Sequence, residues 1–188
     1  MYALPGRDLK DIPVIETERL KLRASRPEDF TSLFAMWQDE EYVRFIGNRK
    51  RSSDEVWSTL QRNIGAWALF GFGYLTIEDK QTGGFVGECG FMLSRRGEIS
   101  PHLPLEPEAG WGIAPAYWGK GIVYEAMAAM IAWADEQDPE FPCHCIVEPG
   151  HSRSSRIAEK LGFTLKGPVP FGESDKIHVF VRRSALGK

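Results

Sequence analysis

The chain has 188 residues, a length that suits one domain with a sizeable core. Apolar residues make up 43% of it and charged residues 26%, which are ordinary values for a soluble globular protein. The net charge of -3 gives no general electrostatic reason to bind nucleic acid or an anionic membrane, so we expect neither partner.

The apolar runs of the sequence are too short to cross a bilayer. The longest, AMAAMIAWA at 126–134, has about half of the roughly 20 residues that a spanning helix needs. Residues 1–13 read as an extended leader without the apolar region of a signal peptide. We therefore expect one cytoplasmic domain over 1–188, with its core at about 14–183.

The three cysteines predict neither a disulfide framework nor a metal site. Cys89, Cys143 and Cys145 are an odd number without framework spacing. Alternation along a strand would send His144 to the face opposite its two cysteine neighbours, and no second cluster completes a tetrahedral site. We expect reduced cysteines and no metal.

In the N-terminal half, the apolar pattern predicts a strand, two helices and a hairpin. The ranges are a strand at 18–25, helices at 26–40 and 52–70, and strands at 73–79 and 83–93. Pro27 lies near the start of the first helix, and Ser52 or Ser53 caps the second. The segment KQTGG has the composition of a turn between the two hairpin strands.

The C-terminal half begins with a polar, proline-rich segment at 94–108 that we expect to be a loop bordering a site. The ranges after it are a strand at 108–115, a helix at 118–137, a strand at 143–148, a helix at 151–162, and strands at 163–167 and 176–183. The whole order predicts a mixed α/β (α+β) domain. Its central sheet is mostly antiparallel and flanked by helices, with a strand–helix–strand crossover in the second half.

The segment WGKGIVYEA at 118–126 places two glycines directly before a helix. Each of Gly119 and Gly121 is less favourable in a helix than alanine by about 1 kcal/mol. A helix start offers unpaired N–H groups to an anion, and glycines let the backbone approach a bulky pyrophosphate. The segment therefore predicts a phosphate cradle, with a plain turn as the alternative. Its spacing fits neither a P-loop nor a dinucleotide fingerprint.

Three segments together resemble the GCN5-related N-acetyltransferase superfamily, and more narrowly its branch of ribosomal-protein N-terminal acetyltransferases. These are ETERLKLRASRPEDF, EAGWGIAPAYWGKGIVYEA and, about thirty residues later, PGHSRSSRIAEKLGF. The resemblance covers about residues 14–183, and its most specific part is the separation of the glycine loop from SSRIAEKLGF. It implies a V-shaped splay between the fourth and fifth strands. It also implies an acetyl-CoA-dependent enzyme that acetylates a primary amine, on a protein N-terminus or a small molecule, by direct attack in a ternary complex.

The resemblance further implies which residues bind acetyl-CoA. In the superfamily the glycine loop holds the pyrophosphate, and the strand before it pairs with the pantetheine arm like an extra strand. The corresponding residues here are Trp111, Gly112, Ile113, Trp118, Gly119, Lys120, Gly121, Ile122, Val123, His151, Ser154 and Arg156. Arg156 is the preferred partner of the 3'-phosphate, whereas we expect Arg153 and Lys160 to face solvent.

The sequence departs from the superfamily pattern at three positions. Ala116 stands where the loop usually begins with Gln or Arg, so the cradle here should consist mainly of backbone. His151 replaces an Asn that commonly contacts the cofactor, and its alternative role is a helix cap or an exposed residue. Ala158 stands where many relatives have a Tyr that acts as the acid for the leaving thiolate.

Attack on the thioester needs a route for the amine proton, an oxyanion donor and sometimes an acid for the thiolate. Glu108 is the leading base, acting directly or through water, and Glu88 is second; either is alternatively a surface carboxylate. Ser154 occupies the position of the sulfur-protonating group in the branch, and is alternatively a residue of the helix cap. The N–H of Ile113 or a neighbour is the expected oxyanion donor.

The acceptor wall is the least recognisable part of the sequence. Its candidate aromatic residues, which are alternatively core residues, are Trp37, Trp57, Trp67 and Phe91. Two other functions stay open: a non-catalytic acyl-CoA-binding or sensing domain, and a nucleotide-binding protein unrelated to CoA. The oligomeric state is open between a monomer and a homodimer.

Overall fold

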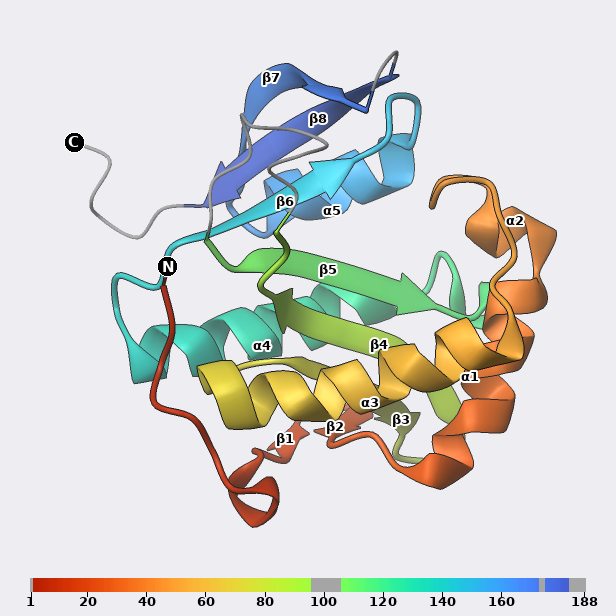
Figure 1. The fold of residues 1–188 in the computed structure, drawn as a ribbon, viewed down its shortest axis with the longest axis vertical. Coiled ribbons are helices and arrows are strands. Elements are labelled where there is room, and N and C mark those ends of the chain that lie inside the picture. The colour runs from red at the N-terminus through yellow and green to blue at the C-terminus, as the bar shows by residue number, and fades with distance from the viewer. Residues whose placement is uncertain (1, 96–105, 173–174, 183–188) are drawn as a thin grey trace.

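An eight-stranded sheet in the order β1-β2-β3-β4-β5-β6-β8-β7 organises the computed structural model, which describes residues 2–95, 106–172 and 175–182. The strands are β1 (Ile15–Glu16), β2 (Leu20–Arg23), β3 (Tyr74–Asp79), β4 (Phe85–Met92), β5 (Glu108–Ile113), β6 (Cys143–Val147), β7 (Thr164–Phe171) and β8 (Asp175–Arg182). The α-helices are α1 (Phe30–Gln38), α2 (Glu40–Val43), α3 (Ser53–Phe70), α4 (Ile122–Gln137) and α5 (Ser152–Lys160). Helices α1 and α3 lie on one face of the sheet, and α4 and α5 on the other (Figure 1).

The expected mixed α/β fold with a mostly antiparallel sheet is confirmed, because every strand pair except β5–β6 is antiparallel. The cap of α3 is also as predicted. The Ser52 side chain accepts a hydrogen bond from the N–H of Glu55, whose carboxylate accepts one from the N–H of Ser52. This reciprocal pair satisfies two N–H groups that the helix leaves without internal partners.

The expected extended leader contains one short regular element, a 3-10 helix at Leu9–Asp11. Strand β1, which follows the leader, pairs with β2. The N–H of Leu4 donates to the carbonyl of Phe70 at 3.0 Å, which ties the leader to the end of α3. Helix α2 was also not predicted, because four residues are too few to display a helical period.

Helix α4 begins at Ile122 rather than at Trp118 as predicted. Gly119 and Gly121 both have φ of 75°, in the left-handed region that glycine adopts without strain. A 3-10 turn at Pro115–Tyr117 and these two glycines redirect the chain from the end of β5 into the helix. The glycines therefore precede the helix and do not weaken it.

The sheet opens between β5 and β6. These strands are parallel and share one paired position, Glu108 with His144, after which they diverge. The neighbouring ladders are much longer: β4 pairs with β5 over six positions and β6 with β8 over five. The expected splay between these two strands is confirmed, and Figure 1 shows the gap widening toward the C-terminal end of β5.

Candidate functional site

The edge of β5 that faces the gap presents backbone groups to it. The N–H of Ala114 donates to the carbonyl of Val86 at 2.9 Å, and the register is continuous from there through the strand. Because antiparallel ladders alternate, the peptide groups of Gly110 and Gly112 point to β4, whereas those of Trp111 and Ile113 point into the gap. The Ile113 carbonyl accepts a hydrogen bond from the Trp118 indole at 2.9 Å.

The glycine loop lies at the wide end of the gap, directly before α4. A Cβ atom added at Gly119 would meet nothing within 4 Å, so the backbone there is open to a ligand. Gly121 is the N-cap of the 16-residue helix α4 and makes no side-chain cap hydrogen bond. The Lys120 ammonium lies 5.5 Å from the centre of the Tyr117 ring, and Ala116 is exposed. The loop thus has accessible backbone at Gly119, and Ala116 adds no polar side chain to it.

The face of the sheet under α1, α2 and α3 is polar beside the gap. Gly110 and Gly112 lie on it, and a Cβ atom at either position would overlap the hydroxyl of a tyrosine. Tyr74 covers Gly110, and Tyr42 covers Gly112. Two phenol hydroxyls thus lie against the strand whose other edge borders the gap.

Glu88 is buried on the same face, opposite Gly112 in the neighbouring strand. The Asn63 amide donates to its carboxylate at 2.8 Å. Burial raises the pKa of Glu88, although the Asn63 hydrogen bond and the nearby guanidinium of Arg51 oppose the shift. Burial, with the charge of Glu88 as a second cause, also raises the pKa of Tyr42, so its phenol is protonated at neutral pH. The structure thus provides a buried acid–base group on this face.

Glu108 lies at the apex of the gap, where β5 and β6 separate. Its side chain is 6% exposed, and its Oε2 atom lies 3.8 Å from Nε2 of His144, which is 2% exposed. That separation is longer than a hydrogen bond. Neither ring nitrogen of His144 has a hydrogen-bond partner among the described residues. A buried imidazole without a hydrogen bond is costly, and the carboxylate of Glu108 is the charged group beside this ring.

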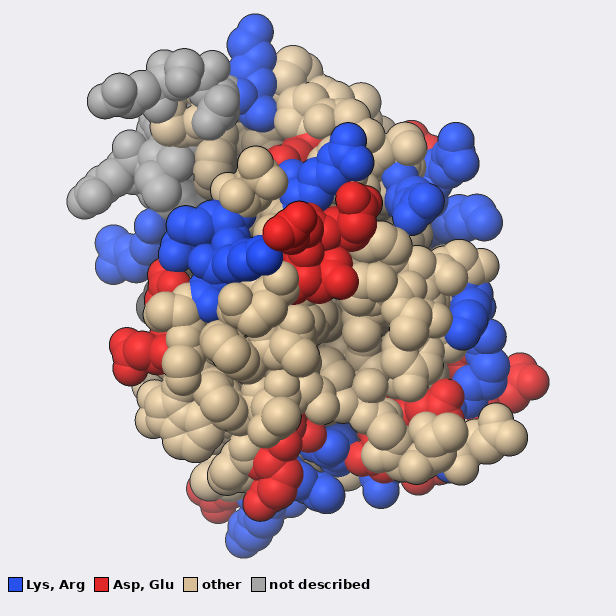
Figure 2. Space-filling view, turned by 90° about the vertical axis from the view of Figure 1, so that its right-hand side faces the viewer, with Lys and Arg blue, Asp and Glu red and all other residues tan. Residues whose placement is uncertain are grey.

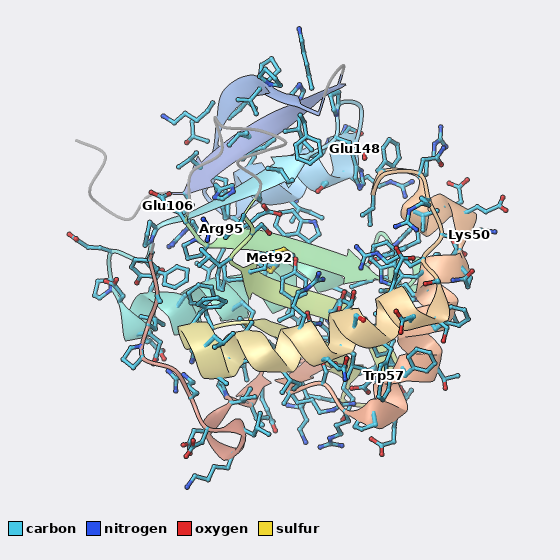
Figure 3. The ribbon with its side chains drawn as sticks, in the orientation of Figure 1. Lys50, Trp57, Met92, Arg95, Glu106 and Glu148 are labelled. Carbon is cyan, nitrogen blue, oxygen red and sulfur yellow. The ribbon has the colours of Figure 1, made fainter. Side chains whose placement is uncertain are left out.

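The start of α5 faces the loop that follows α2 across the wide end of the gap. The rings of His151 and Phe45 stack with centres 4.4 Å apart and an interplanar angle of 19°. The N–H of Gly47 donates to the Glu148 carboxylate at 2.8 Å, and Figure 3 shows Glu148 at this end of β6. Burial, and secondarily the charge of Arg153, lowers the pKa of His151, so its ring is neutral at pH 7.

The remaining residues of α5 lie as follows. Ser154 is buried, and the side chain of the N-cap residue His151 makes no cap hydrogen bond. Arg156 and Lys160 are exposed. Arg153 is exposed, as expected, and its guanidinium also lies 5.7 Å from the centre of the Trp118 ring beside the glycine loop. Ala158, in the position of the missing tyrosine, is fully buried.

The four aromatic candidates for the acceptor wall separate into different layers. Trp67 and Phe91 are fully buried in the core, so of their two predicted roles the structure confirms that of core residues. Trp57 is 39% exposed and packs edge-on against Phe30 on the outside. Trp37 is buried on the polar face, with the Arg51 guanidinium 3.5 Å above its ring. Helical spacing identified an apolar stripe but not the layer that each side chain enters.

Sequence reasoning missed Tyr42, Tyr74 and Arg51. Tyr74 lies in a predicted strand, but Tyr42 and Arg51 lie between the two predicted helices, where no apolar pattern indicates burial. The proline-rich loop expected to border the site lies largely outside the described residues, at 96–105.

Seen from the side at which β5 ends, basic and acidic side chains lie next to one another in a band across the upper part of the molecule (Figure 2). Below this band is a broad area with neither charge. In the described ranges, no three His, Cys, Asp or Glu side chains group to hold a metal ion. No helix in those ranges has the length and apolarity that crossing a membrane requires.

Known proteins resemble this chain in sequence or in fold. A Bacillus subtilis (strain 168) protein named YkkB is 28% identical over 149 residues, which span 78% of this chain and 82% of that protein. The structure of a GNAT-family acetyltransferase from Bordetella pertussis superposes with a TM-score of 0.78 and 30% identity, covering 90% of this chain and 99% of that one.

A structure of RimL, an acetyltransferase of ribosomal protein L7/L12, in complex with coenzyme A has the same fold. Its TM-score is 0.71 at 16% identity, and the alignment covers 92% of this chain and 97% of RimL. The acetyltransferase (GNAT) domain family matches residues 19–164, which include β5, the glycine loop, α4 and α5. The chain is therefore an acyltransferase and belongs to the GNAT acetyltransferase family.

Proposed function

We propose that this acetyltransferase uses acetyl-CoA to acetylate a primary amine, by direct attack in a ternary complex. The observation that carries the proposal is the gap between β5 and β6, which joins a glycine-bounded helix start to a face with two buried carboxylates. The glycine-bounded helix start suits an anionic cofactor, and the face with the two buried carboxylates suits an amine. The acceptor is either a protein N-terminus or a small amine.

The pyrophosphate would bind the amides at the loop and the first turn of α4, from Gly119 to Val123. A helix start and backbone N–H groups favour an anion without any side chain, which fits the alanine at position 116. Trp118 and Lys120 flank this site, and Arg156 remains our candidate for the 3'-phosphate. Arg153, which contacts Trp118, is a second candidate.

The pantetheine arm would pair with the gap-facing peptide groups of Trp111 and Ile113. Gly112 would contribute differently, because its peptide groups point to β4 and its missing side chain admits Tyr42. His151 would border the arm at the wide end of the gap, in the stack with Phe45. The N–H of Trp111 or Ile113 would then be the oxyanion donor.

Glu108 would accept the amine proton, directly or through water, and the bound thioester supplies the acetyl group. Its position at the apex, with His144 beside it, supports this role over that of Glu88. Glu88 remains the alternative, because burial raises its pKa toward the range of a useful base. Ser154, which is buried in the first turn of α5, would protonate the leaving sulfur.

The test is release of free thiol from acetyl-CoA in the presence of a panel of amines. We expect amine-dependent release by the wild type, a loss of about 100-fold or more in kcat for Glu108→Gln, and a smaller loss for Ser154→Ala. The matched control is Glu136→Gln, which changes an exposed carboxylate on α4 and should leave kcat unchanged. Binding of CoA without amine-dependent release would indicate a sensor. A larger loss for Glu88→Gln than for Glu108→Gln would assign the base to Glu88.

A further inference from the structure

Arg19, in the turn between β1 and β2, reaches the glycine loop from a distant part of the sequence. Its Nη1 atom donates to the carbonyl of Lys120 at 2.9 Å. Its Nε and Nη2 atoms contact the Glu125 carboxylate at 2.7 and 2.6 Å. The planar fork of the guanidinium thus holds one peptide carbonyl of the loop and one side chain of α4 together.

The Lys120 carbonyl belongs to the same peptide unit as the N–H of Gly121. The unit is trans, as is every peptide bond in the described residues, so its carbonyl and its N–H point in opposite directions. Holding the carbonyl toward Arg19 therefore turns the N–H of Gly121 away from Arg19. If the unit flipped, an electronegative carbonyl oxygen would replace a donor at the start of α4.

The residues around this peptide do not prevent such a flip by themselves. Gly119 and Gly121 have left-handed φ values, but glycine populates both halves of φ space with similar ease. The N-cap of α4 has no side-chain hydrogen bond to hold it. The contact from Arg19 is the side-chain hydrogen bond that fixes the peptide unit among the described residues.

Glu125 anchors Arg19 from the first turn of α4. Its carboxylate also accepts from the Thr17 hydroxyl at 2.5 Å and from the Arg19 N–H at 3.0 Å. Burial opposes ionisation of Glu125, but these hydrogen bonds outweigh it and hold its pKa below the usual range. The carboxylate therefore stays charged, and its side chain is only 17% exposed. The turn, the loop and the helix start form one connected unit.

We propose that Arg19 is a positioning residue for acetyl-CoA, which fixes the orientation of the Lys120–Gly121 peptide so that the loop offers N–H groups to the pyrophosphate. This inference rests on the proposed function, because it assumes that the pyrophosphate binds there. Arg19 acts through the loop backbone, and Glu125 holds it in place.

The experiment measures CoA binding by calorimetry, and the kinetics of wild type, Arg19→Met and Glu125→Gln. Each substitution should raise the Kd for CoA and the KM for acetyl-CoA by about 10- to 100-fold, the range expected when a hydrogen bond to a charged group is lost. The kcat at saturating acetyl-CoA should change less than about twofold. The effect should be absent with S-acetylpantetheine, which lacks the pyrophosphate, whereas general damage to the fold would lower activity with both thioesters.

Two further variants separate the effect of the hydrogen bonds that Arg19 makes from the effect of its charge. Arg19→Lys keeps the charge but cannot hold the carbonyl and both contacts to Glu125, so its affinity for CoA should stay close to that of Arg19→Met. Arg7→Met removes an arginine that donates hydrogen bonds to Gly71, which caps α3, and to Gln137, at the end of α4 far from the glycine loop. This substitution should leave CoA affinity unchanged.

Two results would overturn the positioning role of Arg19. One is wild-type affinity for CoA in Arg19→Met. The other is wild-type affinity for CoA in Arg19→Lys, which would assign the effect to charge alone. Either result leaves the proposed function intact if the wild type binds CoA. A wild type that binds no CoA would instead contradict the proposed function itself.

Discussion

Gly112 matters to the site because it has no side chain. A side chain there would overlap the hydroxyl of Tyr42, which lies against β5 beside the gap. Tyr42 also packs edge-on against Trp37, with ring centres 5.2 Å apart, so it has little freedom to move aside. The close approach of a buried phenol to a strand thus requires glycine at this position.

We predict that Gly112→Ala destabilises the protein by about 1–3 kcal/mol, the usual range for overpacking a buried site. Tyr42→Phe removes the hydroxyl that the new methyl group would meet, so the double variant should recover part of the loss. Urea unfolding of the two single variants and the double variant measures the coupling between them. The control is Gly65→Ala inside α3, where an added Cβ meets nothing within 4 Å and should not destabilise. Additive effects at positions 42 and 112 would contradict this account.

At the scale of elements, the sequence predicted the long helices and strands because each carries its own apolar period. The glycine loop was predictable too, since its two glycines and the following helix are contiguous. Contacts between distant segments were not: Arg19 and Glu125 are 106 positions apart, and a single sequence carries no signal of their pairing. The sequence left open whether Trp67 and Phe91 lie in the core or line a pocket, because an apolar period gives the buried face of an element and not what packs against that face.

The loop after α2 and the start of α5 meet across the wide end of the gap. Their contacts are the Phe45–His151 stack and the hydrogen bond from Gly47 to Glu148. Both join the helical layer over the polar face to the half of the sheet beyond the gap. A cofactor arm in the gap would pass beside these contacts.

We predict that Phe45→Ala speeds the release of CoA about 2- to 10-fold, which corresponds to the usual contribution of an aromatic pair. The loss of the stack leaves the loop after α2 less firmly held at the open end of the gap. Stopped-flow displacement of bound CoA measures the release rate. Phe34→Ala, which removes an outer ring that stacks on Phe30, is the control and should leave the rate unchanged. An unchanged rate in Phe45→Ala would mean that the stack does not border the cofactor.

At the scale of the whole molecule, the sheet consists of two halves that share one paired position. Strands β1 to β5 form one half and β6, β8 and β7 the other, with Glu108 and His144 at their junction. A ligand arm that pairs with β5 would supply hydrogen bonds where the second half diverges. Acetyl-CoA should therefore stabilise the protein as a missing strand would.

We predict that acetyl-CoA at 100 times its Kd raises Tm by about 5–10 °C, because binding of that strength adds about 2.7 kcal/mol to a domain of this size. Amide hydrogen exchange tests where the stabilisation arises. The amides of Trp111 and Ile113 point into the gap and should exchange more slowly with ligand, beyond the general slowing of the sheet. Those of Gly110 and Gly112 already bond to β4, so they provide the control within the same strand. Equal slowing at all four positions would show that the ligand stabilises the fold without pairing along β5, and would contradict the assignment of this edge to the cofactor arm.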